Sequence, residues 1–129
     1  PVNLLIDTHV ALWALSSPDR MAPDVREMLR DPAHLVHVSA VTVWEVEIKR
    51  AIGKLSAPEG FAGECLDRGF DPLPIELAHA ERAGRLPPHH ADPFDRMLVA
   101  QALEEDLILV SDDRALVAYD VRTIPASPR

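Results

Sequence analysis

Cysteine is almost absent from this 129-residue sequence: Cys65 has no partner, which excludes an intrachain disulfide framework. We expect Cys65 to be a small buried side chain rather than a nucleophile. Long hydrophobic runs are also lacking, because no apolar segment approaches the roughly 18 residues of a membrane span. The first residues do not combine a basic segment with a long apolar stretch, so no signal peptide is expected. We therefore expect a cytoplasmic protein without a membrane segment.

Positive charge is scarce as well, since 13 basic residues stand against 21 acidic ones and the net charge is −8. This balance argues against binding nucleic acid through bulk positive charge, but it permits an enzyme that holds phosphates through a bound cation. The only lysines are Lys49 and Lys54, whereas a phospho-accepting receiver domain would need a lysine late in the chain. A phosphatase with an Asp-x-Asp nucleophile is excluded because His9 stands two residues after Asp7.

Short apolar segments alternate with amphipathic ones along the whole chain, which predicts a single domain over residues 1–129. The expected strands are 2–6, 35–39, 73–75, 107–111 and 121–124. The expected helices are 10–15, 25–30, 41–52, 59–68, 77–83 (with Gly84 as its stop) and 93–105. This order indicates an α/β fold with three layers, α/β/α, around a mostly parallel sheet of four or five strands. The helical spacing of Trp13 and Trp44 predicts that both lie in the core.

Acidic residues follow two of the predicted strands. Asp7 ends the first strand, and Asp112 and Asp113 follow the strand at 107–111. In an open parallel sheet, ligands bind beyond the carboxyl ends of the strands, so these acids lie where a site is expected. Taken singly, each of them is equally well explained as a helix cap.

Two further acids border predicted apolar helix faces. Glu45 lies beside the stripe of its helix, although an exposed i, i+4 pair with Lys49 would also explain it. Asp95 lies in the first turn of the helix at 93–105, where a favourable interaction with the helix dipole is the alternative role. Asp92 before Pro93 has the pattern of a structural N-cap.

Four carboxylates gathered in one crevice would repel one another, by about 4 kcal/mol per pair at roughly 4 Å and an effective dielectric near 20. Such a cluster persists by raising its pKa values or by binding divalent cations. Ligands that are all oxygen select hard metals such as Mg²⁺ or Mn²⁺, and these metals suit the hydrolysis of phosphodiesters. The histidines lack the spacing of a zinc site. We expect His89 and His90 to be exposed or structural, and His9 to line the crevice.

The motifs resemble, in order and over nearly the whole chain, those of the PIN-domain family, and in particular the VapC-type toxins of bacterial toxin–antitoxin pairs. The matching segments are 5–9 (LIDTH), 39–49 (SAVTVWEVEIK), 53–55 (GKL), 86–90 (LPPHH), 92–96 (DPFDR), 101–102 (QA) and 109–113 (LVSDD). The resemblance implies a metal-dependent endoribonuclease, usually dimeric, that cleaves structured RNA such as transfer or ribosomal RNA. It also implies inhibition by a small VapB-type antitoxin.

The resemblance assigns the family's four metal-site acids to Asp7, Glu45, Asp95 and Asp113. Asp112 is adjacent to Asp113 and is an alternative for the fourth acid. Ser111 stands where the family carries a hydroxyl near the metal. Candidates for contact with RNA are Arg96, Lys49, Lys54 and Ser111. Two alternatives stay open, namely a PIN-like module that binds RNA or protein without cutting, and hydrolysis of DNA.

Overall fold

The computed structural model describes residues 1–128, which are built around a five-stranded sheet in the order β3-β2-β1-β4-β5. All four neighbouring pairs of strands are parallel, which confirms the predicted parallel sheet. The strands are β1 (Asn3–Ile6), β2 (Leu35–Ser39), β3 (Asp71–Leu73), β4 (Ile108–Val110) and β5 (Thr123–Ile124).

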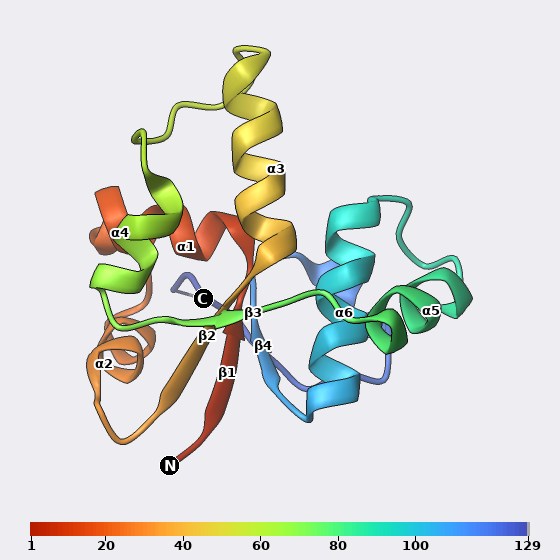
Figure 1. The fold of residues 1–129 in the computed structure, drawn as a ribbon. Coiled ribbons are helices and arrows are strands. Elements are labelled where there is room, and N and C mark those ends of the chain that lie inside the picture. Colours follow the sequence, from red (N-terminus) through yellow and green to blue (C-terminus); the bar gives the residue numbers. More distant parts are fainter. Residues whose placement is uncertain (129) are drawn as a thin grey trace.

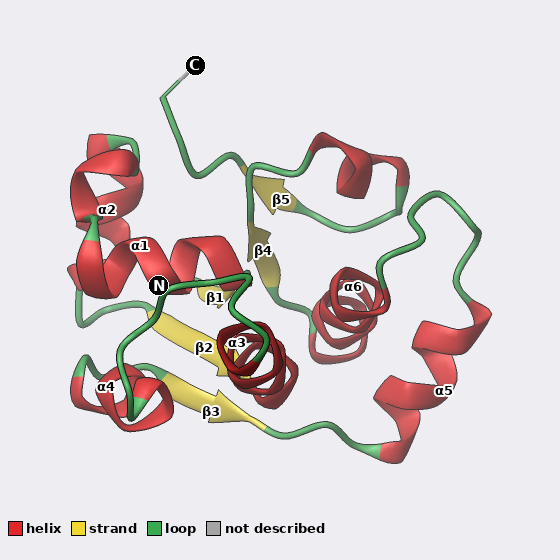
Figure 2. Cartoon of the chain, turned by 90° about the horizontal axis from the view of Figure 1, so that it is seen from above, coloured by secondary structure: helices red, strands yellow, loops and turns green. Residues whose placement is uncertain are grey.

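Helices cover both faces of this sheet, which confirms the three-layer prediction. Figure 2 shows α1, α2 and α4 on one face and α5 and α6 on the other. The α-helices are α1 (Thr8–Ser16), α2 (Pro23–Arg30), α3 (Ala40–Ala51), α4 (Phe61–Asp67), α5 (Leu77–Arg85) and α6 (Pro93–Glu105). Two short 3₁₀ helices, η1 (Pro18–Arg20) and η2 (Arg114–Ala118), complete the fold. Within residues 1–128, no helix is long and apolar enough to cross a membrane.

The core has two halves, one on each side of the sheet, because successive side chains of a strand point to opposite faces. Leu4 and Ile6 of β1 pack into the half formed with α1, α2 and α4, whereas Leu5 packs into the half formed with α6. All three side chains are fully buried, and burial of each contributes about 1.5–3 kcal/mol. Cys65 lies in the first half and is also fully buried, which confirms its predicted structural role.

Three local predictions differ from the structure. The strand expected at 73–75 lies at Asp71–Leu73, because its partner β2 ends at Ser39, opposite Leu73, where α3 begins. The helix expected to stop at Gly84 continues to Arg85, and Leu86 is its C-cap. Leu86 precedes Pro87, and helical backbone is disfavoured for a residue before proline. Trp44 is 59 % exposed rather than in the core, because α3 projects away from the sheet (Figure 1).

The connections between strands reverse direction at β1. From β1 the chain passes to β2 and then to β3 on one side, and it then crosses through α5 and α6 to β4 on the other side of β1. Such a reversal opens a crevice beyond the carboxyl ends of the two central strands. The acids that follow β1 and β4 therefore flank this crevice.

Candidate active site

Asp7 is fixed at the seam between β1 and β4. Its backbone N–H donates to the Val110 carbonyl (3.1 Å), and its Oδ1 accepts the Val10 N–H (2.9 Å), so the side chain also caps α1. The residue is only 5 % exposed. Burial raises the pKa of Asp7, although a hydrogen bond from Ser111 and the Val10 amide oppose the increase.

Asp112 and Asp113 follow β4 but make different contacts. Oδ1 of Asp112 accepts the backbone N–H groups of Ala126 (2.7 Å) and Ser127 (2.8 Å) and so holds the segment after β5. Oδ1 of Asp113 accepts the Ala115 N–H (2.9 Å) at the start of η2. The other oxygen of Asp113, Oδ2, faces the start of α6, where it meets His90.

Asp95 comes from the first turn of α6. Asp92 is the N-cap of this helix, with its Oδ1 accepting the Phe94 (2.8 Å) and Asp95 (3.3 Å) N–H groups, which confirms its predicted structural role. Burial, reinforced by the negative charge of Asp92, raises the pKa of Asp95 from 3.8 to about 7. The fold thus disfavours the ionised form of Asp95.

Glu45 is 5 % exposed on α3, beside the start of α1. Its Oε1 accepts the Thr8 hydroxyl (2.6 Å), and its Oε2 pairs with the Lys49 ammonium. The pair raises the pKa of Lys49. The i, i+4 pair expected from the sequence is present, but it is not the exposed pair of that alternative, because Glu45 is buried. Its negative charge contributes to the raised pKa of Asp95.

A cavity of about 590 Å³ lies over the ends of β1 and β4. Its lining residues are Asp7, His9, Val10, Trp13, Arg20, Asp95, Asp112, Asp113 and Ser127. Four of them are aspartates that come from three separate parts of the chain, and His9 lines the cavity as predicted. These carboxylates fit a hard divalent cation, because its charge would relieve the repulsion and desolvation that raise the pKa values of Asp7 and Asp95.

Comparison with known proteins decides the family. The family model described as PIN domain matches residues 4–122. The chain belongs to the PIN domain family. No curated protein sequence matches it.

Solved structures share the fold of this PIN domain at low sequence identity. The crystal structure of VapBC2 from Rickettsia felis bound to a DNA fragment from its promoter has a TM-score of 0.71 and 14 % identity, and it covers 98 % of this chain and 100 % of the other. DNA-bound VapBC from Salmonella typhimurium has a TM-score of 0.70 and 16 % identity, covering 96 % and 98 %. VapBC-5 from Mycobacterium tuberculosis has a TM-score of 0.60 and 21 % identity, also covering 96 % and 98 %.

His90 lies in the acidic site of the PIN domain, and this is the main feature that sequence reasoning missed. Its Nε2 is 2.7 Å from Oδ2 of Asp113 and 3.2 Å from Oδ2 of Asp95. The hydrogen bond to Asp113 and the charge of Asp95 raise the pKa of His90. The structural role expected for His89 and His90 therefore omitted a contact with two site acids. The signal in the sequence was its place five residues before Asp95.

The candidates for RNA contact occupy different environments. Arg96 donates to the carbonyls of Ala83 (2.8 Å), Leu86 (3.0 Å) and Pro87 (3.0 Å), so its guanidinium is engaged in holding the loop before α6. Lys54 is exposed just beyond the far end of α3, and Ser111 is 5 % exposed beneath Asp7. Arg20, which the sequence did not indicate, lines the cavity with its guanidinium 4.9 Å from the centre of the Trp13 ring.

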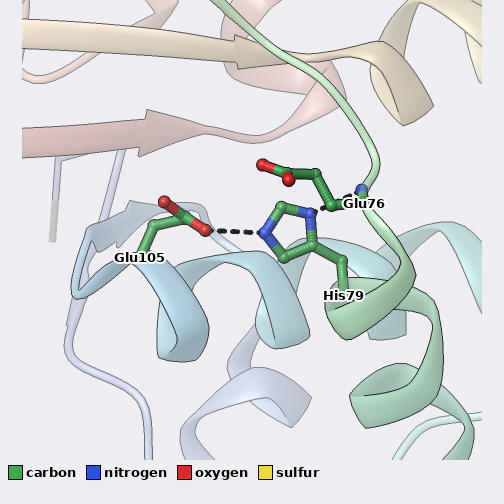
Figure 3. Close-up of side chains that lie close together, drawn as sticks. All are labelled: Glu76, His79 and Glu105. Atoms are coloured by element: carbon green, nitrogen blue, oxygen red, sulfur yellow. Dashed lines mark hydrogen bonds and ion pairs between the residues drawn. The ribbon is translucent and has the colours of Figure 1, made fainter.

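A second group of ligating side chains lies away from the cavity, where α5 and α6 meet (Figure 3). The Glu76 N–H donates to Nδ1 of His79 (3.0 Å), and Nε2 of His79 is 2.8 Å from the Glu105 carboxylate. Because Nδ1 is an acceptor, the ring proton lies on Nε2 and is donated to Glu105. Both nitrogens are thus engaged, and we interpret this group as a clamp between two helices rather than a metal centre.

Proposed function

We propose that this PIN domain is a Mg²⁺- or Mn²⁺-dependent endoribonuclease that acts as a VapC-type toxin on structured RNA such as transfer or ribosomal RNA. The observation that carries the proposal is the convergence of Asp7, Asp95 and Asp113 on one cavity at the reversal point of the sheet. The toxin–antitoxin complexes that share its fold support the same assignment.

Asp7, Asp95 and Asp113 are the proposed cation ligands. Asp113 is preferred to Asp112 as the fourth acid, because Asp112 already accepts two backbone amides. A bound divalent cation would supply a more acidic water and would stabilise the departing oxygen of the phosphodiester. Glu45 does not line the cavity and has one oxygen on the Thr8 hydroxyl and the other on Lys49, so its proposed role is to add negative charge beside Asp95.

Contact with substrate phosphate is assigned to Arg20. Its guanidinium reaches the cavity wall and stacks over Trp13, whereas Arg96 would have to break its carbonyl contacts to reach a phosphate. Lys49 and Lys54 are weaker candidates, since Lys49 is paired with Glu45 and Lys54 lies beyond α3. A single cation beside the metal site suits an acidic protein that binds its substrate through few contacts.

The proposed partners are a VapB-type antitoxin and a second copy of the chain, in the cytoplasm. The toxin–antitoxin complexes of similar fold support the first. Two exposed apolar side chains, Trp44 of α3 at 59 % and Ile52 directly after it at 61 %, support the second. Light scattering of the antitoxin-free protein at micromolar concentration tests the dimer, and a monomer mass would count against it.

The experiment for the activity is cleavage of total cellular RNA by purified, antitoxin-free protein in Mg²⁺ or Mn²⁺ and in EDTA. Asp7→Asn is the matched control, because it removes charge but retains volume and a side-chain oxygen able to cap α1. Circular dichroism verifies that the variant is folded. We expect fragments that require the metal and are lost in the variant.

Other outcomes select the alternatives. Absence of cleavage in either metal by protein that binds RNA would favour a non-catalytic module. Metal-dependent cleavage of single-stranded DNA in preference to RNA would overturn the substrate assignment. Full activity in folded Asp7→Asn protein would contradict the proposed acidic site.

A further inference from the structure

We propose that His90 is a positioning residue of the metal site, which holds one oxygen of Asp95 and one of Asp113 and thereby arranges the two carboxylates for the cation. This inference rests on the proposed function only in requiring that the acidic cavity bind a divalent metal. It concerns a side chain that lies at the cavity's edge and that the four-acid assignment leaves without a role.

The contact joins side chains from two separate parts of the chain. Asp95 belongs to the first turn of α6 and Asp113 follows β4, yet Nε2 of His90 lies within 3.2 Å of Oδ2 of both. Two carboxylates alone repel, by about 4 kcal/mol at roughly 4 Å and an effective dielectric near 20. The Nε2–H of His90 donates to Oδ2 of Asp113 and lies 3.2 Å from Oδ2 of Asp95, so it offsets that repulsion and fixes which oxygens point toward it. Hydrogen bonds of this kind to ligating groups commonly set metal affinity.

The orientation of the ring makes Nε2 a donor rather than a metal ligand. Nδ1 accepts the backbone N–H of Asp92 at 3.1 Å. With that lone pair engaged, the ring carries its proton on Nε2, which then faces the two acids. Ligation through Nε2 would require a proton on Nδ1, opposite the Asp92 N–H, so the two donors would face each other. His90 is therefore placed to orient carboxylates and not to coordinate the cation.

Hydrogen bonds with Tyr119 and Arg96 fix the loop that carries His90. The His90 N–H donates to the Tyr119 hydroxyl (3.0 Å), and that hydroxyl donates to the Pro87 carbonyl (2.9 Å). Arg96 adds its contacts with the carbonyls of Leu86 and Pro87. These four hydrogen bonds fix a loop of irregular backbone beside the site, and the His90 side chain is only 19 % exposed. This arrangement places the imidazole before any metal binds.

Two variants separate the roles of the two ring nitrogens of His90, because each places an amide atom near one of them. In His90→Asn the amide oxygen replaces Nδ1, so the Asp92 N–H keeps an acceptor while the acids lose their donor. In His90→Gln the amide N–H₂ reaches the position of Nε2 and keeps a donor for Asp95 and Asp113. His89→Gln is the matched control, because the neighbouring His89 is exposed and its ring packs against Tyr119 rather than the acids.

The measurement is the dissociation constant of Mn²⁺ for the full chain, from the electron paramagnetic resonance signal of free Mn²⁺ during titration. We expect His90→Asn to weaken binding by about 10- to 100-fold, the usual range for a lost partner of a metal ligand. His90→Gln should stay within about threefold of the wild type and His89→Gln should match it. Thermal unfolding of all variants excludes a general loss of fold.

Two outcomes would overturn the role of His90 and leave the metal site intact. These are a His90→Asn protein that binds Mn²⁺ as tightly as the wild type, or more tightly, and equal weakening in both His90 variants. Pulsed resonance of bound Mn²⁺ supplies a second readout: nitrogen modulation typical of a directly bound imidazole would make His90 a ligand and overturn the positioning role. Wild-type protein that binds no Mn²⁺, or that binds it equally well as Asp7→Asn, would overturn the metal site itself together with this inference.

Discussion

The ionised form of Asp95 is disfavoured by the fold, so removal of its charge is expected to stabilise the metal-free protein. Its side chain is 22 % exposed and lies near Asp92, Asp7 and Glu45. The pKa of Asp95 is raised from 3.8 to about 7, chiefly by burial. The variant Asp95→Asn retains the volume of the side chain and removes the charge. We therefore expect it to unfold less readily than the wild type at high pH.

The size and the sign of the effect follow from the two pKa values. A raised folded-state pKa favours the folded protein below the ordinary pKa of 3.8, and this stability is lost as the pH rises through about 7. At pH 8 the difference corresponds to about 4 kcal/mol as an upper limit. We expect Asp95→Asn to raise the free energy of unfolding by about 2–4 kcal/mol at pH 8 and by about 1 kcal/mol at pH 5.

Urea denaturation in EDTA at both pH values measures this difference. Asp120→Asn is the control, because Asp120 is exposed and its replacement removes the same charge. At pH 5, where the expected difference is about 1 kcal/mol, saturating Mn²⁺ should reverse the order, since a ligand at about 100 times its dissociation constant adds about 2.7 kcal/mol to a protein that binds it. An Asp95→Asn protein that is no more stable than the wild type at pH 8 in EDTA would refute the reasoning.

Two arginines give further predictions. Arg96→Lys should lower the free energy of unfolding by about 2–4 kcal/mol in urea denaturation, because a lysine cannot donate to the three carbonyls in the geometry of a guanidinium. Arg20→Gln should raise the KM for RNA and leave kcat within about twofold, because a phosphate contact away from the reacting atoms contributes to uniform binding. A lower kcat with unchanged KM would contradict the role of Arg20.

Local sequence signals were sufficient for the layers of the fold and for the acids at strand ends. The run 2–6 predicted a buried strand, and Asp7 follows it at the carboxyl edge of the sheet as expected. The failure at Trp44 has a physical reason: helical periodicity identifies an apolar stripe but does not reveal whether a partner covers it. Since α3 extends past the sheet (Figure 1), Trp44 meets the Phe94 ring edge-on but stays 59 % exposed.

The contact of His90 with Asp113 could not be predicted from local pattern, because the two residues are 23 positions apart and meet only through the crossing of α6 to β4. The same limit applies to the choice among the acids. Asp7, Asp92 and Asp113 each cap a helix, so each has a structural reason to be present. A sequence motif cannot separate that reason from a functional one.

Asp95 is the acid for which a structural explanation fails. Within residues 1–128 its carboxylate caps no helix, and its polar contact is with His90. Burial and the surrounding acids nevertheless raise its pKa to about 7. The position of Asp95 in the first turn of α6 is favourable, but burial and the neighbouring acids outweigh it and disfavour the ionised carboxylate. Carboxylates with such raised pKa values concentrate at functional sites. Among the site acids, Asp95 therefore gives the strongest physical reason to regard the cavity as a cation-binding site.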